Sequence, residues 1–459
     1  MNLKRGIYYS FMIIILFFTG LNLYGETLKL TLEEAIALGL KNSSSLQAKN
    51  YALQAAIAEL KAAEAGHYPN ISASASWTHL FDQPKTSDMT IDMGGMGAFT
   101  IPGSYMSASD PISVSLSVSQ SIYAGGRVKT SIEMSKKKVE MARLDLQEEK
   151  RKLIVQIKKA FYGYILAKDV KEVVKETLNN KLESLNVAKK RFNAGLVPDY
   201  EVLSAETDVE SFMPQVISAE NQVKYALLSV KELLGIKEKE DFDIELVGKL
   251  EAEDITYDEN KLLSMALDHK YDVLQFKSNL EILKLVDRLN RASKLPAVSA
   301  FVSYSLESGY DSTTGENKYW GKDSWSDNLT CGLSVMVPLS SLFPWSSENA
   351  KIKQGEFNIS EAKTGFDSLK SGIKLQIKNL LLRLEEEKAK IKSGEKSIEL
   401  ATKLYNSSKE RYSKGLISRL DLSNSEIKLN NVKIGYLTAV YNYKLAVFDL
   451  MDVVGVDNL

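Results

Sequence analysis

The chain has a single cysteine, Cys331, among its 459 residues, so no intrachain disulfide bond can form. Its histidines, His67, His79 and His269, are scattered without the spacing of a metal site. There is no glycine-rich phosphate loop, nucleophile elbow or Ser/His/Asp grouping. The formal net charge is −1, so there is no basic excess for nucleic acid. We therefore expect no catalysis, no metal or cofactor site and no nucleic-acid partner.

Long hydrophobic runs are also scarce. The run Phe11–Phe18 follows Lys4 and Arg5 and precedes a plausible cleavage site after Gly25. This pattern predicts a cleaved secretory signal peptide over residues 1–25. An uncleaved anchor helix is the alternative, but the run is short for a span of ~20 residues. After this segment the sequence has no run of 18 apolar residues, so no transmembrane helix is predicted. No cysteine lies near the cleavage site to serve as a lipid attachment point.

The sequence contains an internal duplication. The segment Arg191–Val197 (RFNAGLV) returns as Arg411–Ile417 (RYSKGLI). Leu233–Ile236 meets Val453–Val456 at the same spacing along the chain. A duplication of this length predicts two copies of one structural unit, stacked around a common axis.

Proline is absent and glycine occurs once between Arg127 and Asn193, where apolar residues recur at helical spacing. A helix of this length would run ~100 Å, far beyond a globular helix. The second copy, Ser346–Lys414, has the same character. Each predicted rod ends at a repeated glycine, Gly195 or Gly415, and turns into a return helix. The return helices are expected at Tyr200–Leu234, which Pro214 should kink, and at Asp421–Val454.

Four segments alternate apolar and polar residues with the period of two that is typical of strands. The clearest is Ile112–Ser119 (ISVSLSVS), in which one face is apolar and the other is serine. We expect strands at about 70–82, 111–123, 297–308 and 328–339. Each has about the 9–11 residues that cross a bilayer at a tilt. The alternative is a soluble β-sandwich, but a sandwich needs more strands and the rest of the chain is helical.

Four strands cannot close a barrel, and an open sheet edge in lipid would leave backbone groups unpaired. The barrel must therefore be shared among chains. Two chains would give eight strands and three would give twelve. A central channel favours three, because eight-stranded barrels are filled by side chains.

Several motifs together resemble the outer membrane efflux protein family, the TolC-like outer membrane factors. The resemblance covers about Leu28 to Val456. It rests on the duplicated Arg-aromatic-x-x-Gly-Leu tip, on Leu32–Asn42 as the N-terminal helix, and on Ser121–Arg127 as a strand-to-helix passage. The second copy departs from this pattern at Ser341–Trp345, where the Gly-Gly pair is replaced.

The resemblance implies a homotrimer with a 12-stranded transmembrane β-barrel continuous with a long periplasmic α-helical barrel. The first repeat would cover residues 26–254 and the second 255–459, with a mixed equatorial region that includes Lys237–Thr256. The resemblance also implies an exit duct in the outer membrane lipid, for tripartite efflux or type I secretion. Its tips would meet a periplasmic adaptor that couples to an inner-membrane pump.

The resemblance assigns roles at the tips. Asp421 falls where an acidic ring narrows the entrance, and Glu201 is its counterpart in the first copy. Asn424 falls where the family has a second acid. Tyr412 matches a tyrosine that can hydrogen-bond the neighbouring acid, here Glu201. A locking arginine of the family falls on Ile417, and Arg419 is its possible substitute. Adaptor contact is implied for four tip residues: Gly195, Leu196, Gly415 and Leu416.

For Asp421, a solvated or helix-capping acid is the alternative to a pore ring. For the whole chain, the alternative is a trimeric coiled-coil adhesin with a membrane anchor. An adhesin usually carries one barrel segment at its C-terminus, whereas here the strands are split between the two halves. An outer membrane enzyme is a third and weaker alternative.

Overall fold

The computed structural model describes residues 28–236, 244–253, 257–321 and 324–456. The predicted signal peptide, residues 1–25, lies outside them, as does part of the segment expected near an equatorial region. The chain divides into two compact units. One comprises Met1–Ala52, Arg143–Gln275 and Phe366–Leu459, and the other comprises Leu53–Ala142 and Phe276–Gly365. Each unit draws on both halves of the duplication, so these units cut across the two predicted repeats.

Helices dominate the chain. In order they are α2 (Leu32–Asn42), α3 (Ser44–Glu64), α4 (Arg127–Asn193), α5 (Asp199–Leu233), α6 (Glu259–His269), α7 (Tyr271–Ala292), α8 (Ser347–Ser413) and α9 (Arg419–Val454). Among the described residues, none of these helices combines the length and the apolar content that a membrane span requires.

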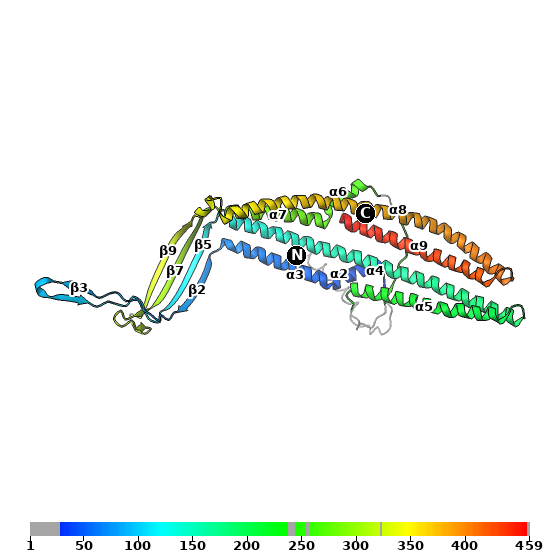
Figure 1. Ribbon diagram of the computed structural model, residues 1–459, viewed down its shortest axis with the longest axis horizontal. Coiled ribbons are helices and arrows are strands. Elements are labelled where there is room, and N and C mark those ends of the chain that lie inside the picture. The colour runs from blue at the N-terminus through cyan, green and yellow to red at the C-terminus, as the bar shows by residue number, and fades with distance from the viewer. Residues whose placement is uncertain (1–27, 237–243, 254–256, 322–323, 457–459) are drawn as a thin grey trace, which may run out of the picture. The chain divides into compact units, whose positions relative to one another are not determined.

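The predicted long helices are confirmed. Helices α4 and α8 are each 67 residues long, and each is followed by an antiparallel return helix, α5 or α9 (Figure 1). Pro214 lies inside α5, which is a single helix from Asp199 to Leu233. We call α4–α5 hairpin 1 and α8–α9 hairpin 2.

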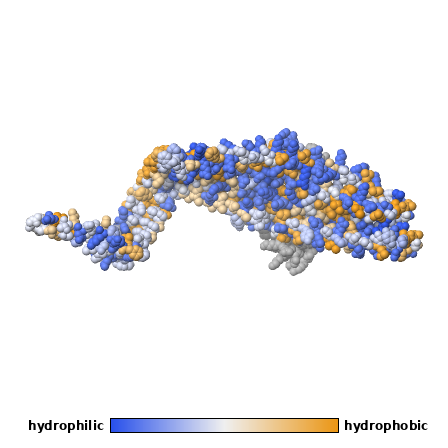
Figure 2. Space-filling view, viewed as in Figure 1, coloured by the Kyte–Doolittle hydropathy of each residue, from blue (hydrophilic) through white to orange (hydrophobic). Residues whose placement is uncertain are grey.

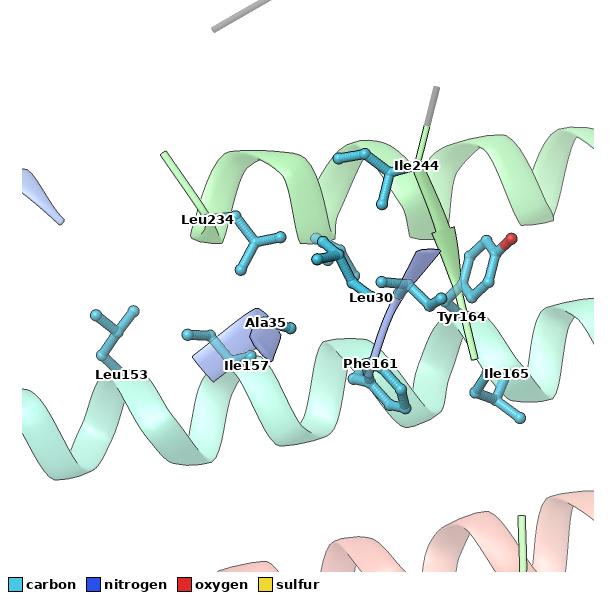
Figure 3. Packing of buried hydrophobic residues seen from close by; sticks show 11 residues of the cluster. Leu30, Ala35, Leu153, Ile157, Phe161, Tyr164, Ile165, Leu234 and Ile244 are labelled. Atoms are coloured by element: carbon cyan, nitrogen blue, oxygen red, sulfur yellow. The ribbon is translucent and has the colours of Figure 1, made fainter. Parts of the chain in front are cut away.

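A hydrophobic core in the first compact unit forms where α2 and a small sheet meet α4 and α5 (Figure 3). Strand β1 (Leu28–Leu30) pairs in parallel with β6 (Ile244–Leu246). On α4 the residues Leu153, Ile157, Phe161 and Ile165 recur every four positions, so they share the helix face that is buried here. Full burial of each such side chain contributes about 1.5–3 kcal/mol.

The second half of the chain builds a comparable core from α6, α8 and α9. Its buried members include Leu262, Ile373, Ile377 and Leu450. The N-terminal helices of the two halves are capped differently. Thr31 and Glu34 form a capping box at α2, whereas Asp258 accepts two backbone hydrogen bonds at the start of α6.

The second compact unit contains an antiparallel sheet in the order β2–β5–β7–β9 (Figure 1). Its strands are β2 (Asn70–Trp77), β5 (Ile112–Tyr123), β7 (Ala297–Tyr310) and β9 (Trp325–Met336). The short strand β8 (Asn317–Lys318) pairs with the end of β7. Within the described ranges, β2 pairs only with β5 and β9 pairs only with β7, so each leaves one edge open.

The register separates the two faces as the alternation predicts. Leu116 lies beside Ala73 and Tyr304, and Tyr304 lies beside Leu329, so these residues share the apolar face with Leu333. The opposite face carries hydroxyl groups in a ladder, with Oγ–Oγ distances of 2.8 Å in three pairs: Ser72–Ser117, Ser74–Ser115 and Ser76–Ser113. Ser115 and Ser334 both belong to this polar face.

Four strand boundaries differ from those expected. Strand β2 ends at Trp77 rather than near residue 82, and β7 continues to Tyr310. Strand β9 starts earlier, at Trp325, because Trp325–Asp327 pair with Leu306–Ser308 of β7. It ends at Met336, shortly before Pro338, which has no amide to donate to a ladder.

Between β2 and β5, the expected loop contains a hairpin that the residue pattern did not predict. Strand β3 (Met89–Asp92) pairs with β4 (Ala98–Ile101) around a glycine-rich turn. Gly94 and Gly97 adopt positive φ there. Both strands of this hairpin are exposed on both faces. Among the residues that the structure describes, they pack against no hydrophobic core, so they need no alternation of apolar and polar residues from which strands could be predicted.

The two strand-to-helix passages differ in construction. In the first, Gly125 and Gly126 adopt φ of 59° and 80°, and a Cβ on Gly125 would lie 2.8 Å from Leu295 Cβ. In the second, a 3-10 turn, Leu339–Leu342, replaces the glycine pair. The Asn349 side chain donates to Phe343 O at 2.7 Å and holds this turn against the start of α8.

Candidate functional site at the hairpin tips

The two tips are built alike by their backbones. Gly195 and Gly415 adopt φ of 70° and 74°, as expected for glycines that end a helix. The amide of Gly195 donates to Phe192 O at 2.8 Å and that of Leu196 to Arg191 O at 2.9 Å. Hairpin 2 repeats both bonds through Gly415 and Leu416 at 2.9 Å each. Each tip is therefore a Schellman motif that projects one leucine.

These projecting leucines are largely exposed to solvent. Leu196 exposes 70 % of its surface and Leu416 exposes 65 %. A pair of large apolar side chains held out by rigid turns is a surface suited to contact with another protein.

Asp421 lies in the first turn of α9 and forms a capping box with Ser418. Its carboxylate accepts from Ser418 N at 3.1 Å and from Ser418 Oγ at 2.7 Å, while Ser418 Oγ accepts from Asp421 N. The hydrogen bond from the Ser418 side chain, then that from its backbone, lowers the pKa of Asp421. The residue is exposed, so it both caps the helix and keeps a charged carboxylate in solvent.

Asn424 lies about one turn further along α9 and is also exposed. It shares a shallow surface depression with Asp421, Arg411 and Lys428 between α8 and α9. The structure therefore brings Asp421 and Asn424 together on one side of hairpin 2.

The predicted hydrogen bond between Tyr412 and Glu201 is not formed. Tyr412 is buried, with 3 % exposure, and its hydroxyl has no partner among the described residues. Glu201 Oε2 is likewise buried without a partner there. Burial, followed by the negative charge of Glu201, raises the pKa of Tyr412. The two groups are thus neighbours in one chain, each with an unused hydrogen-bonding atom.

Tyr412 is instead covered by hairpin 1. The guanidinium of Arg191 lies 5.7 Å from the Tyr412 ring centroid, and its Nη1 donates to Tyr412 O at 3.4 Å. This arrangement combines a cation–π contact with a hydrogen bond to the end of α8.

Arg419 links the two hairpins of one chain. Its guanidinium donates to the carboxylate of Asp208 and to Ser204 Oγ, both on α5. The arginine side chain is 17 % exposed and that of Asp208 is 32 % exposed. Arg419 was expected as a substitute for a locking arginine, and it has the contacts of an interhairpin link within the chain.

A buried ion pair nearby was not predicted from the sequence. Lys181 Nζ on α4 lies 3.3 Å from Glu426 Oε2 on α9. Burial raises the pKa of Glu426, and the charge of Lys181 opposes this shift. Glu426 falls in the stripe Leu422, Ser425, Glu426, Leu429, which is buried at i, i+3, i+4 and i+7. The glutamate within this otherwise uncharged helical stripe was the sequence signal that could have indicated a buried ion pair.

Within the described ranges, no group of three or more His, Cys, Asp or Glu side chains could hold a metal ion. The arrangement at the tips consists of exposed leucines, exposed acids and interhairpin ion pairs. Such a set can bind a partner and bias the passage of charged solutes.

Comparison with known proteins agrees with this architecture. The family model described as "Outer membrane efflux protein" matches residues 35–236. Outer membrane protein TolC of Escherichia coli (strain K12) is 21 % identical over 376 residues, 79 % of this chain and 74 % of TolC. The alkaline protease secretion protein AprF of Pseudomonas aeruginosa is 23 % identical over 436 residues, 91 % of this chain and 86 % of AprF.

Solved structures share the fold at low identity. The Campylobacter jejuni CmeC outer membrane channel has a TM-score of 0.71 at 18 % identity and covers 92 % of this chain and 85 % of its own. The Neisseria gonorrhoeae MtrE outer membrane channel has a TM-score of 0.70 at 16 % identity and covers 93 % and 89 %. With its duplicated hairpins and its four-stranded sheet, the chain is thus similar to outer membrane efflux proteins over residues 35–236 and shares the fold of these outer membrane channels.

Proposed function

We propose that this protein is the outer membrane exit duct of a tripartite efflux or type I secretion system. It passively conducts substrates that a periplasmic adaptor and an inner-membrane pump deliver. The sheet lies in the outer membrane and the helical hairpins lie in the periplasm. A protein with the same fold is named as an outer membrane channel, and a relative in sequence is named as a protease secretion protein, which supports a passage for solutes.

One observation carries this proposal: the four-stranded sheet is amphipathic and open at both edges. In lipid, the free backbone groups of β2 and β9 must find partners. The strands alternate in direction, so β9 of one chain can pair antiparallel with β2 of the next. Three chains close a 12-stranded barrel in this way. The serine ladder then lines the lumen and the face with Leu116 and Leu333 meets lipid.

The tips complete the duct on the periplasmic side. Leu196 and Leu416 are the surface that we assign to the adaptor, because both are exposed on rigid turns. Asp421 lies beside Asn424 on an exposed side of hairpin 2. In a trimer, three Asp421 carboxylates around one axis would form a cation-favouring constriction.

A trimeric adhesin stalk is the competing function. An adhesin would have no need of two hairpins that return to paired tips, nor of a polar face along every strand. Single-channel recording of purified protein in planar bilayers tests the choice. A duct gives discrete conductance steps, and their absence from a preparation that is trimeric by light scattering, corrected for bound detergent, would favour the adhesin.

A further inference from the structure

The duplication is preserved residue by residue in the hairpins. Helices α4 and α8 have the same length, and α5 and α9 begin at matching positions of the two copies, Asp199 and Arg419. The two tips also make the same pair of backbone hydrogen bonds. A residue in hairpin 1 therefore has a defined structural counterpart in hairpin 2.

Within one chain, hairpin 2 docks on hairpin 1 through a charged contact. Arg419 donates to Asp208 and Ser204 across the two hairpins. This contact joins the first turn of α9 to the part of α5 near its start. In a ring of hairpins, each hairpin has two neighbours, and only one of them belongs to the same chain.

We propose that the same contact, with its charges exchanged, joins hairpin 2 of one subunit to hairpin 1 of the next; this rests on the trimeric ring of the proposed function. In the alignment of the two copies, Asp199 of the first copy corresponds to Arg419 of the second. Likewise, Asp208 of the first copy corresponds to Lys428 of the second. Asn424 takes the place of Ser204. The pair thus changes from arginine–aspartate to aspartate–lysine, and the two charges remain opposite. Asp199 of one subunit binds Lys428 of the partner subunit.

The residues concerned are available for such a contact. Asp199 and Lys428 are both exposed, and neither has an ion pair or side-chain hydrogen bond within the described part of the chain. Lys428 and Asn424 border the same surface depression together with Arg411 and Asp421, so a carboxylate that enters it meets two cationic groups and an amide beside one acid. One partner is short and the other long, as in the Arg419–Asp208 pair, so the combined reach is similar.

Charge and hydropathy extend the match beyond this pair. Helix α5 carries seven acidic and two basic residues, whereas residues 388–413 of α8 carry seven basic and three acidic ones. Both helices expose apolar side chains near the tips: Tyr200 and Leu203 on α5, and Leu400 and Leu404 on α8. Figure 2 shows apolar surface interspersed with hydrophilic surface in the helical region. The α5 helix of one copy and the α8 helix of a second copy therefore have complementary charges, and both offer apolar side chains for contact.

Cross-linking in full-length protein tests the pairing. In a Cys331→Ala background, the variant Asp199→Cys with Lys428→Cys is treated with a short bifunctional thiol reagent and run on a denaturing gel. Covalent dimers and trimers are expected. The matched control, Asp208→Cys with Arg419→Cys, should react within one chain and run as a monomer.

Light scattering of the same samples separates a failure of the pairing from a failure of the trimer. If the protein is trimeric and the control pair cross-links, but Asp199→Cys with Lys428→Cys yields only monomer, the pairing is wrong and the duct stands. If no trimer is found, the ring itself fails and the pairing fails with it.

A charge exchange gives a second readout. Lys428→Glu puts like charges at the contact and should increase the open fraction in single-channel records. Adding Asp199→Lys to this variant should restore the wild-type open fraction. If the double variant opens as much as Lys428→Glu alone, the two residues do not interact and the pairing is overturned.

Discussion

Lys181 Nζ and Glu426 Oε2 lie 3.3 Å apart between α4 and α9, with side-chain exposures of 11 % and 8 %. The pair connects hairpin 1 with hairpin 2 of the same chain, and it is more withdrawn from solvent than the Arg419–Asp208 link. Such buried ion pairs add little net stability as a pair, but removal of one partner leaves an uncompensated charge.

We therefore expect Lys181→Met to destabilise the hairpins by about 3 kcal/mol. Lys181→Met combined with Glu426→Gln should recover most of this loss, because no buried charge remains. Thermal unfolding followed by helical circular dichroism measures both effects. Equal losses in the single and double variants would show that Lys181 acts through packing alone.

The same pair predicts a pH dependence. The folded-state pKa of Glu426 is raised from 4.5, so the folded protein binds a proton more tightly than the unfolded chain does. Its contribution to stability is greatest below pH 4.5, falls as pH rises towards the folded-state pKa, and is level above it. The free energy of unfolding, measured from pH 4.5 up to neutrality and beyond, should fall more steeply with pH in the wild type than in Glu426→Gln. Parallel curves would contradict the raised pKa.

The two tip glycines should respond differently to alanine. Both adopt left-handed backbone conformations, which cost about 1 kcal/mol for alanine. A Cβ on Gly195 meets nothing within 4 Å, whereas a Cβ on Gly415 lies 3.0 Å from Arg191 Nη2. Gly415→Ala should therefore also displace Arg191 from the Tyr412 ring and lose up to about 1 kcal/mol more. Hydrogen exchange at the two tips compares them, with Gly195→Ala as the control.

The faces of the sheet can be tested with single cysteines. In a Cys331→Ala background, Ser115→Cys and Ser334→Cys should react with a membrane-impermeant thiol reagent that enters the lumen. Leu116→Cys and Leu333→Cys should be protected, because the register puts them on the apolar face, which we propose meets lipid. Equal labelling of Ser115→Cys and Leu116→Cys would remove the assignment of the faces.

Asp421 should govern ion selectivity at the entrance. Asp421→Ala is expected to weaken cation preference and to relieve block by trivalent cations added from the periplasmic side. Asn424→Asp, which adds a carboxylate in the same depression, should strengthen both. Reversal potentials across a salt gradient measure the change. Wild-type values for Asp421→Ala would leave this residue with its capping role only.

Glu201 and Tyr412 provide a test of gating. Each has a buried oxygen without a partner among the described residues, so a small movement that joins them would stabilise a closed tip. Glu201→Gln and Tyr412→Phe should then raise the open probability to a similar extent, and the double variant should add little. Single-channel records of the three variants compare them. Additive effects would mean that the two residues act separately.

Periodicity along the chain was sufficient for the fold. Two uninterrupted helical stripes, four strands of period two and a repeat of the tip motif are local signals that depend on near neighbours. They located both ends of α4 and α8 closely and assigned Leu116 and Ser115 to opposite faces. The left-handed turns at Gly195 and Gly415 were also predictable, because a helix that ends in this way favours glycine.

Contacts between distant segments needed the folded chain. The pairing of Lys181 with Glu426, the partners of Arg419 and the absence of a Tyr412–Glu201 bond depend on how helices from the two copies of the duplication pack together. Sequence spacing carries no information on that packing. Strand ends and the β3–β4 hairpin were not predictable either, since pairing with a neighbouring strand, and not side-chain pattern, sets where they start and stop.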